Sequence, residues 1–181
     1  MGRAMGCGSG RRVVFVTGGA RSGKSRFAQA RVEAWEGRLL YIATAEVGDP
    51  EMADRVARHR ADRGPRWDTE EEPLDLGRSL ERAASYGGAL LDCLTLWTSN
   101  LLGRWGDDEE GIRHAVAGFL SALEAFPGRL CVVTNEVGAG IVPANPLARR
   151  FRDLAGRINQ EAASRADEAY LVVSGLPVRL K

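Results

Sequence analysis

The chain has 181 residues, a length typical of one domain with a full hydrophobic core. Its 25 basic and 24 acidic residues give a formal net charge of +1, which argues against a dedicated nucleic-acid-binding protein. Hydrophobic residues make up 44% and charged residues 27%, and no apolar run approaches the length of a membrane span, so we expect neither a disordered nor a membrane-spanning chain.

The cysteines and the first residues indicate the compartment and the extent of the domain. Cys7, Cys93 and Cys131 have no paired spacing, and the chain has only two histidines, so neither a disulfide framework nor a structural zinc site is expected. This pattern is typical of a reducing compartment, hence of a cytoplasmic protein with Cys93 and Cys131 as small core residues. Residues 1–12 lack the apolar segment of a signal peptide, and we interpret them as a disordered N-terminal extension before a single domain at 13–181.

Short apolar runs alternate with helical patterns along the chain. Strands are expected at 13–16, 39–43, 89–92, 130–134, 169–173 and 176–180. Helices are expected at 26–35, 51–63, 74–84, 94–102, 107–126 and 146–166, and Asp107 is the predicted cap of the fifth. Pro177 makes the last strand an edge strand. Because the strands are continuous apolar runs separated by helices, they predict an α/β fold with a mostly parallel sheet and helices on both faces.

A phosphate-binding loop follows the first strand directly. It matches G-x-x-x-x-G-K-[ST] with the residues Gly18, Gly19, Ala20, Arg21, Ser22, Gly23, Lys24 and Ser25. The glycines let backbone N–H groups point at phosphate oxygens, and the next helix adds the positive end of its dipole. Lys24 supplies a cation to the β- and γ-phosphates, and the Ser25 hydroxyl can ligate Mg²⁺. The loop predicts a P-loop NTPase-like fold.

A carboxylate that assists Mg²⁺ should follow a later strand. Asp92 ends the run Gly88–Asp92 and fits that position, although a strand-end aspartate can also simply cap the next helix. Glu136, after the strand at 130–134, is a rival carboxylate at the same edge of the sheet. The predicted Mg²⁺ ligands are therefore Ser25 and Asp92, with Glu136 left as the alternative.

His59 lies in the segment EMADRVARHRADR, which predicts a helix. Arg55, His59 and Arg63 follow one another at intervals of four residues and share one stripe of that helix. Flanking guanidinium groups lower the pKa of an imidazole, which leaves it neutral and nucleophilic, and they can hold the phosphate that it attacks. From these residues alone, a solvated charged face that includes a histidine is the favoured interpretation. His114 is interpreted as ordinary helix surface or packing.

Several segments occur together in an order that resembles one enzyme family. They are GGARSGKS, YIAT, EMADRVARHRADR, W-x-T-x-E at 67–71, DCLTLW at 92–97, NLL at 100–102, TNEVGAGIVP at 134–143, RRFRDLAGRINQ and SGLPVRLK. Over about residues 13–181 the chain closely resembles the bifunctional adenosylcobinamide kinase/adenosylcobinamide-phosphate guanylyltransferases of cobalamin synthesis. The histidine helix together with TNEVGxGIVP is far more specific than the phosphate loop, which very many proteins share.

The resemblance implies two reactions. ATP or GTP first phosphorylates the aminopropanol hydroxyl of adenosylcobinamide. GTP is then attacked at its α-phosphate, pyrophosphate leaves, and GMP is held on a histidine until adenosylcobinamide phosphate takes it. The family's guanylylated histidine falls on His59, which overturns the plainer interpretation of that residue. The implied nucleotide contacts are the loop at 18–25 and Thr44, Ala45, Glu46, Arg60, Ala61, Asp62, Arg63, Glu71 and Asp92. Members of the family associate, so a homo-oligomer, specifically a trimer, is also expected.

Two other functions fit the same loop. One is a plain small-molecule P-loop kinase in which His59 is inert, and the other is a regulatory module that binds GTP without turnover. Guanylyl transfer requires His59 and neither alternative does, so this residue discriminates between them. Nucleic-acid binding is disfavoured by the balanced charge.

Overall fold

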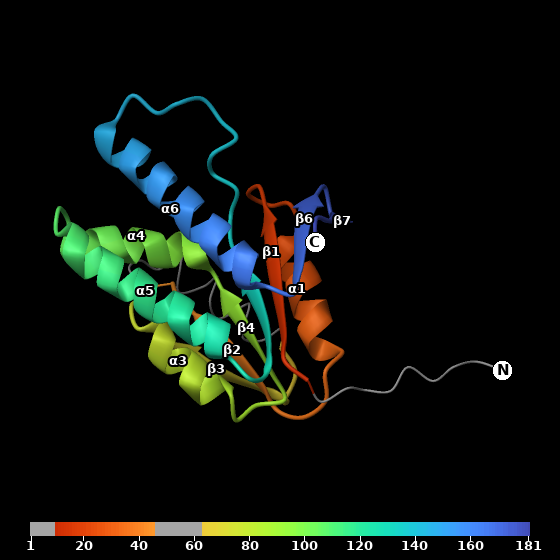
Figure 1. The fold of residues 1–181 in the computed structure, drawn as a ribbon. Helices are drawn as coiled ribbons and strands as arrows, with labels where there is room; N and C mark the ends of the chain where they lie inside the picture. Colours follow the sequence, from red (N-terminus) through yellow and green to blue (C-terminus); the bar gives the residue numbers. More distant parts are fainter. Residues whose placement is uncertain (1–9, 46–62) are drawn as a thin grey trace.

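The expected strands and helices assemble around one sheet (Figure 1). The computed structural model describes residues 10–45 and 63–181, and within these ranges seven strands are ordered β3-β2-β4-β5-β1-β6-β7. The strands are β1 Arg12–Gly18, β2 Leu39–Ala43, β3 Trp67–Glu71, β4 Gly88–Asp92, β5 Arg129–Val133, β6 Glu168–Val173 and β7 Leu176–Arg179. The helices are α1 Lys24–Glu33, α3 Leu76–Ala83, α4 Leu94–Trp105, α5 Glu109–Ala125 and α6 Pro146–Arg165.

The sheet is parallel except at one edge. All pairings among β1 to β6 are parallel, and β7 pairs antiparallel with β6. This confirms the predicted mostly parallel sheet and the edge position of the strand that carries Pro177. Ala43 is paired with both Glu71 and Asp92, and Asp92 is paired with Val133. The carboxyl ends of neighbouring strands therefore align along one edge, where open α/β sheets bind their ligands.

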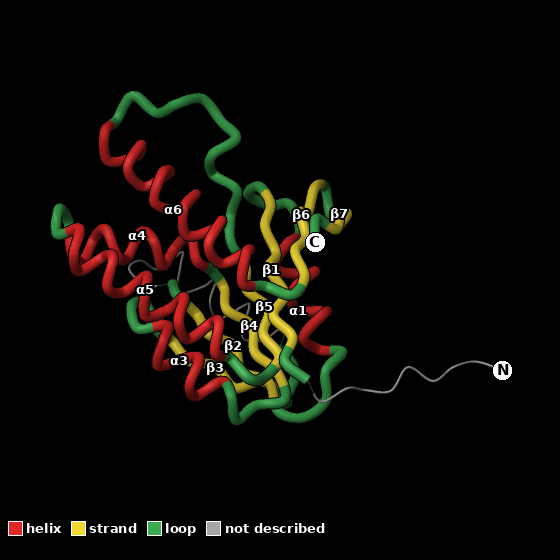
Figure 2. Tube along the Cα trace, viewed as in Figure 1, coloured by secondary structure: helices red, strands yellow, loops and turns green. Residues whose placement is uncertain are grey.

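Helices cover both faces of the sheet, unequally among the described elements. Helix α1 packs alone on one face, against β1, β4, β5 and β6, whereas α3 to α6 form a layer on the other (Figure 2). Each face has its own buried cluster. Trp97 of α4 and Phe119 of α5, with ring centroids 5.1 Å apart, are the largest fully buried side chains of the second layer. Cys93 and Cys131 are buried, as predicted.

Strand β3 is an element that the sequence analysis did not predict. Its residues Trp67–Glu71 include three carboxylates and contain no apolar run. It nevertheless pairs with β2 along its whole length and forms the other edge of the sheet. An edge strand whose side chains are only partly buried does not need a hydrophobic sequence, and this explains why the hydrophobicity pattern missed it.

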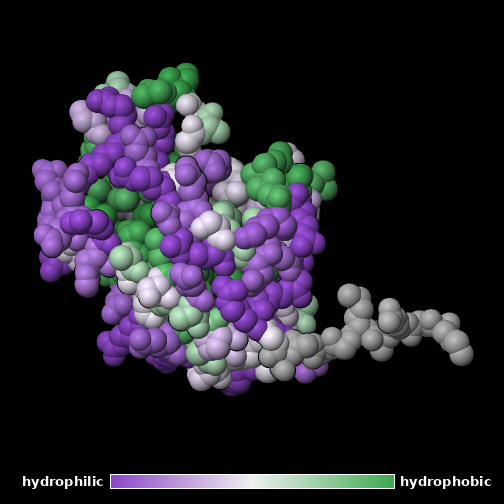
Figure 3. All heavy atoms as spheres, viewed as in Figure 1, coloured by the Kyte–Doolittle hydropathy of each residue, from purple (hydrophilic) through white to green (hydrophobic). Residues whose placement is uncertain are grey.

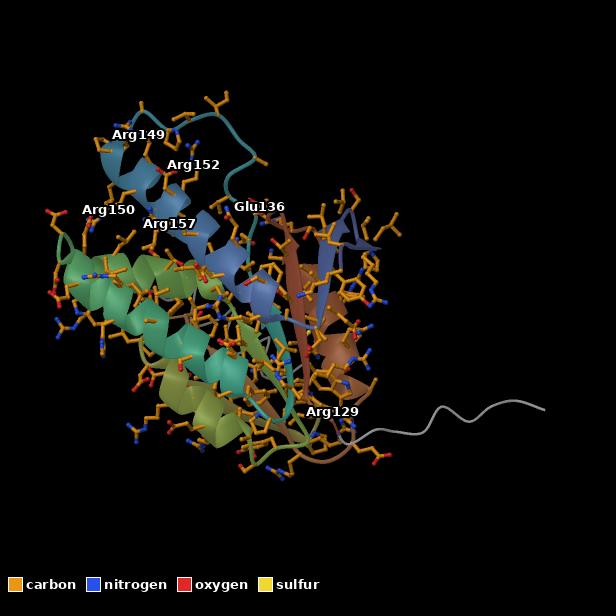
Figure 4. The ribbon with its side chains drawn as sticks, in the orientation of Figure 1. Arg129, Glu136, Arg149, Arg150, Arg152 and Arg157 are labelled. Carbon is orange, nitrogen blue, oxygen red and sulfur yellow. The ribbon has the colours of Figure 1, made fainter. Side chains whose placement is uncertain are left out.

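Two predicted boundaries also differ from the structure. The cap of α5 is Asp108, whose Oδ1 accepts hydrogen bonds from the backbone N–H groups of Glu110 and Gly111, and not Asp107. The Asp107 carboxylate instead pairs with Arg150 of α6 at 2.8 Å, and Arg150 is labelled in Figure 4. Strand β1 begins at Arg12, inside the predicted extension, because Arg12 pairs with Arg129 of β5 and its backbone N–H donates to the carbonyl of Gly128 at 2.9 Å.

The predicted helix at 51–63 lies outside the described residues apart from Arg63, as does most of the predicted extension at 1–12. Among the described helices, none is both long enough and apolar enough to cross a bilayer.

Candidate active site

A cavity of about 350 Å³ opens at the carboxyl ends of β1, β2, β4 and β5. It is lined by Ala20, Arg21, Lys24, Ser25, Tyr41, Ala43, Ala45, Arg63, Thr69, Asp92, Cys93, Leu96 and Asn135. The phosphate loop and the carboxylate of Asp92, the candidate metal ligand, thus line the same cavity, although they are almost 70 residues apart in the sequence. The volume is that of a small-molecule site.

The phosphate loop has the backbone conformation that its glycines allow. Gly23 has a φ of 92° and Arg21 a φ of 56°, and the chain turns there into α1, whose first residue is Lys24. The Lys24 side chain is buried, and its Nζ donates to the carbonyl of Gly19 at 3.2 Å. Within the described ranges no side chain caps the start of α1, so its first N–H groups are available to an anion, the arrangement that binds phosphate.

The loop packs tightly against the turn between β6 and β7. A Cβ on Gly18 would lie 2.5 Å from the carbonyl oxygen of Val172, and one on Gly23 would lie 3.2 Å from the Cα of Gly175. The N–H of Gly175 donates to the Ser22 carbonyl at 2.8 Å. These contacts are with backbone atoms, which cannot rotate away, so the glycines at 18 and 23 are required for packing as well as for conformation.

Asp92 is held by an aromatic side chain that the sequence analysis did not select. The Tyr41 hydroxyl donates to Asp92 Oδ2 at 3.1 Å. Burial, together with the negative charge of Asp92, raises the pKa of Tyr41 above its usual value, so the phenol stays protonated and remains a donor. The Arg63 guanidinium carbon lies 3.6 Å from the centre of the Tyr41 ring, a cation–π contact.

Thr44, the residue after β2, holds the backbone that follows Asp92. It is fully buried, and its hydroxyl donates to the carbonyl of Cys93 and accepts from the N–H of Cys93, both at 2.8 Å. Asn100 of α4 donates to the carbonyl of Thr44 at 2.8 Å. The backbone N–H of Thr44 donates to the carbonyl of Asp92 at 3.2 Å. The hydroxyl and both backbone groups of Thr44 therefore make hydrogen bonds within the protein next to Asp92.

The structure brings together part of the predicted site. The predicted residues that line the cavity are Ala20, Arg21, Lys24, Ser25, Ala45, Arg63 and Asp92. Glu71 is exposed at the end of β3 and is not among the lining residues. Glu46, His59, Arg60, Ala61 and Asp62 lie outside the described residues.

Of the two candidate carboxylates, Asp92 faces the cavity. Glu136 is exposed where the chain leaves β5 (Figure 4), and its Oε1 accepts from the N–H of Gly138 at 3.3 Å. Among the described residues no group of three His, Cys, Asp or Glu side chains could hold a metal ion alone. Mg²⁺ in nucleotide sites needs only one or two protein oxygens besides phosphate, and the Ser25 hydroxyl and the Asp92 carboxylate fit that requirement.

Tyr41, Thr69 and Asn135 are polar lining residues that sequence reasoning missed. Tyr41 interrupts the apolar run LLYIA. Asn135 comes two residues after the strand residues LCVV, with Thr134 between them, whereas Asp92 follows GALL directly. For Asn135 the available signal is a polar residue just beyond the carboxyl end of a buried strand; for Tyr41 it is a polar side chain within an apolar strand.

Comparisons with known proteins find similar sequences along nearly the whole chain and a similar fold. The family model described as cobinamide kinase / cobinamide phosphate guanyltransferase matches residues 14–180. The bifunctional adenosylcobalamin biosynthesis protein CobP of Pseudomonas aeruginosa is 46% identical over 169 residues, which cover 92% of this chain and 96% of that protein. CobU of Escherichia coli, of the same description, is 41% identical over 181 residues, covering 93% and 99%. Among solved structures, an ATPase of a type III secretion system has a TM-score of 0.53 at 12% identity, covering 93% of this chain and 56% of that one, a likeness of fold alone.

Proposed function

The chain belongs to the family of cobinamide kinases / cobinamide phosphate guanylyltransferases, and from this premise we propose that the cavity at the carboxyl edge of the sheet serves both reactions. The enzyme phosphorylates cobinamide and guanylylates cobinamide phosphate in adenosylcobalamin biosynthesis. The observation that carries the proposal is that Lys24, Ser25 and Asp92 line one cavity together with Arg63, the residue that ends the predicted histidine helix.

In the kinase reaction the loop at 18–25 holds the triphosphate of ATP or GTP. The N–H groups at the start of α1 bind phosphate oxygens, and Lys24 neutralises the charge that develops on the β- and γ-phosphates. Ser25 and Asp92 are the residues that would hold Mg²⁺, which supplies further positive charge to the phosphates. Phosphoryl transfer depends mostly on positioning and charge, so these groups suffice without a covalent intermediate.

In the guanylyl transfer His59 is the proposed nucleophile. An imidazole nitrogen bonds to the α-phosphorus of GTP while the bond to the bridging oxygen breaks and pyrophosphate leaves with that electron pair. Cobinamide phosphate then displaces the histidine and takes the GMP. Arg63 supports this assignment because it lines the cavity and follows His59 by four residues, and four residues span at most about 14 Å.

The remaining nucleotide contacts are proposed from the family resemblance. They are Thr44, Ala45, Glu46, Arg60, Ala61, Asp62, Arg63, Glu71 and Asp92. Ala45, Arg63 and Asp92 line the cavity, which supports them most directly. A cytoplasmic site of action is likewise proposed from the free cysteines.

We also propose that the chain forms a homo-oligomer, specifically a trimer. Figure 3 shows hydrophobic areas on this face, among them one over the loop before α6 and one over the β6–β7 turn. Exposed apolar residues there include Ile141, Val142, Leu147, Leu176 and Val178, of which Ile141 is 97% exposed. Exposed apolar areas of this kind are typical of protein–protein contacts.

The test uses GTP labelled at its α-phosphate and Mg²⁺. The parent protein is expected to acquire label that is acid-labile and alkali-stable, as a phosphoramidate is, and the His59→Ala variant to acquire none. The matched control is His114→Ala, because His114 lies on α5 beside an open groove between α3 and α5 and not in the cavity. The transferase mechanism is supported if the parent and the His114→Ala control are labelled and the His59→Ala variant is not. Absence of label on a parent that binds GTP refutes it and leaves a kinase or a GTP-binding module.

A further inference from the structure

Tyr41 lies between the two strands whose side chains complete the metal end of the cavity. It is paired with Thr69 of β3 on one side and with Leu90 of β4 on the other. Two residues further along β2, Ala43 is paired with Asp92. Because side chains two residues apart on a strand project on the same face, Tyr41, Thr69 and Asp92 share the face of the sheet that α1 covers.

The Tyr41 hydroxyl orients the carboxylate that is the candidate Mg²⁺ ligand. It donates to Asp92 Oδ2 at 3.1 Å, and within the described part of the chain the Asp92 carboxylate accepts no second hydrogen bond. Without this bond the carboxylate is free to rotate about its side-chain torsions. The phenol occupies one lone pair of Oδ2 and leaves Oδ1 to a cation. Groups that hold a metal-binding carboxylate in this way raise its affinity for the metal.

The ring of the same side chain holds an arginine. The guanidinium carbon of Arg63 lies 3.6 Å from the centre of the Tyr41 ring, and Arg63 Nη2 donates to the Thr69 hydroxyl at 3.4 Å. Arg63 is only 9% exposed, so this cation–π contact is largely desolvated, the condition under which such contacts are strongest. Trp67 meets the Tyr41 ring edge-on, with centroids 6.4 Å apart, and restrains its orientation.

The two contacts of Tyr41 belong to different parts of the nucleotide site. Asp92 is the residue that would hold Mg²⁺ together with Ser25, and all three side chains line the cavity. Arg63, which lines it as well, is an expected nucleotide contact and follows His59 by four residues. One side chain of β2 therefore connects the metal carboxylate to the end of the histidine segment.

We propose that Tyr41 is a positioning residue of the nucleotide site, whose hydroxyl orients Asp92 toward Mg²⁺ and whose ring holds Arg63 at the cavity. This inference rests on the proposed function of the cavity. The two roles are separable by substitution. Phenylalanine keeps the ring and loses the hydroxyl, whereas leucine keeps an apolar side chain and loses both.

The test compares the parent with Tyr41→Phe, Tyr41→Leu and Tyr86→Phe. Tyr86 is the matched control, because it is a partly buried tyrosine that packs against the core of the other helix layer and does not line the cavity. The affinity for a nonhydrolysable GTP analogue is measured with Mg²⁺ and with EDTA. The ratio of the two affinities, the Mg²⁺ effect, needs no turnover. Urea denaturation shows that each variant is folded.

We expect Tyr41→Phe to reduce the Mg²⁺ effect at least about fivefold, the consequence of losing one hydrogen bond to a charged metal ligand. Its affinity in EDTA should stay within about twofold of the parent, because the ring still holds Arg63. Tyr41→Leu should reduce the Mg²⁺ effect equally and also lower the affinity in EDTA at least about fivefold, because the cation–π contact is lost. Tyr86→Phe should match the parent in both quantities.

Each role has a result that would overturn it. An unchanged Mg²⁺ effect in Tyr41→Phe, or a parent that does not bind the analogue more tightly with Mg²⁺, would overturn the role of the hydroxyl. Equal affinities of Tyr41→Phe and Tyr41→Leu in EDTA would overturn the role of the ring. Failure of the proposed function is recognised separately, because the parent would then acquire no label from α-labelled GTP, whereas the binding measurements would still decide the inference.

Discussion

Replacing Glu168 by Gln is expected to destabilise the protein at neutral pH and to weaken the dependence of its stability on acid pH. Glu168 begins β6, and its side chain is 8% exposed. Its carboxylate accepts from Arg12 Nε at 2.6 Å, from Arg31 at 2.7 Å and from the Tyr170 hydroxyl at 2.7 Å. Burial opposes ionisation, but the hydrogen bonds from Tyr170 and Arg12 and the charge of Arg31 outweigh it and lower the pKa of Glu168 to about 2.

The size of the effect follows from this pKa. In the unfolded chain the carboxyl titrates near its usual value of 4.5, and in the folded protein at about 2. At about 1.4 kcal/mol for each pKa unit, the difference corresponds to about 3 kcal/mol. Because the folded-state pKa is the lower one, this stabilisation is fully present above pH 4.5 and is lost as the pH falls from there toward 2. The arginines that remain are 49% and 28% exposed, so water solvates them in part in the variant.

The assay is urea denaturation of the parent and of Glu168→Gln at pH 7, 5, 4 and 3. The free energies of unfolding should differ by about 3 kcal/mol at pH 7, and the difference should shrink to about 1.4 kcal/mol at pH 3, one unit above the folded-state pKa. The matched control is Glu161→Gln, which removes an exposed i,i+4 ion pair with Arg165 and should cost less than about 1 kcal/mol. A parent and a Glu168→Gln variant with the same pH dependence would refute the reasoning.

Three further predictions concern the loop, the core and the cysteines. Gly18→Ala places a Cβ 2.5 Å from the carbonyl oxygen of Val172, so nucleotide affinity should fall at least about tenfold in equilibrium binding, and unchanged affinity would show that the loop can shift. Trp97→Ala empties a fully buried site and should lower the free energy of unfolding by about 3–5 kcal/mol in urea; a loss below 1 kcal/mol would contradict the packing. Burial raises the pKa of the Cys93 thiol to about 11 and that of Cys131 to about 12, so neither should be alkylated in the native protein at pH 8, and a modified peptide found by mass spectrometry before unfolding would count against this.

The layers of the fold were predictable because strands buried on both faces appear in the sequence as continuous apolar runs. The runs at 39–43 and 130–134 are apolar on both faces, and they became β2 and, shifted by one residue, β5. Strand β3 was not predicted because it is an edge strand with three carboxylates. Backbone pairing to β2 holds it in the sheet, and such pairing leaves no hydrophobic pattern in the sequence. The helix cap was placed one residue too early, at Asp107. The sequence has two adjacent aspartates there and does not show which of the two side chains reaches the first N–H groups of the helix.

Part of the candidate site was predictable because its residues are adjacent in the sequence or end a recognisable strand. The loop at 18–25 acts through contiguous residues, so its pattern survives in the sequence, and Asp92 was recognised from its place at the end of a strand. Tyr41 and Asn135 matter through strand order, which puts β2 and β5 on either side of β4. That order is a property of the whole sheet and cannot be read from either residue alone.

The contact between the phosphate loop and the β6–β7 turn has a consequence for synthesis on the ribosome. Gly175 binds the carbonyl of Ser22 across 153 positions of chain, and β6 pairs with β1 from Val14 to Gly18. A nascent chain that has been translated only as far as α6 already contains the whole loop motif, but it lacks the strand and the turn that support it. Nucleotide binding should therefore be acquired late in translation, and a fragment stopped before residue 168 should be a poor GTP binder despite its intact motif.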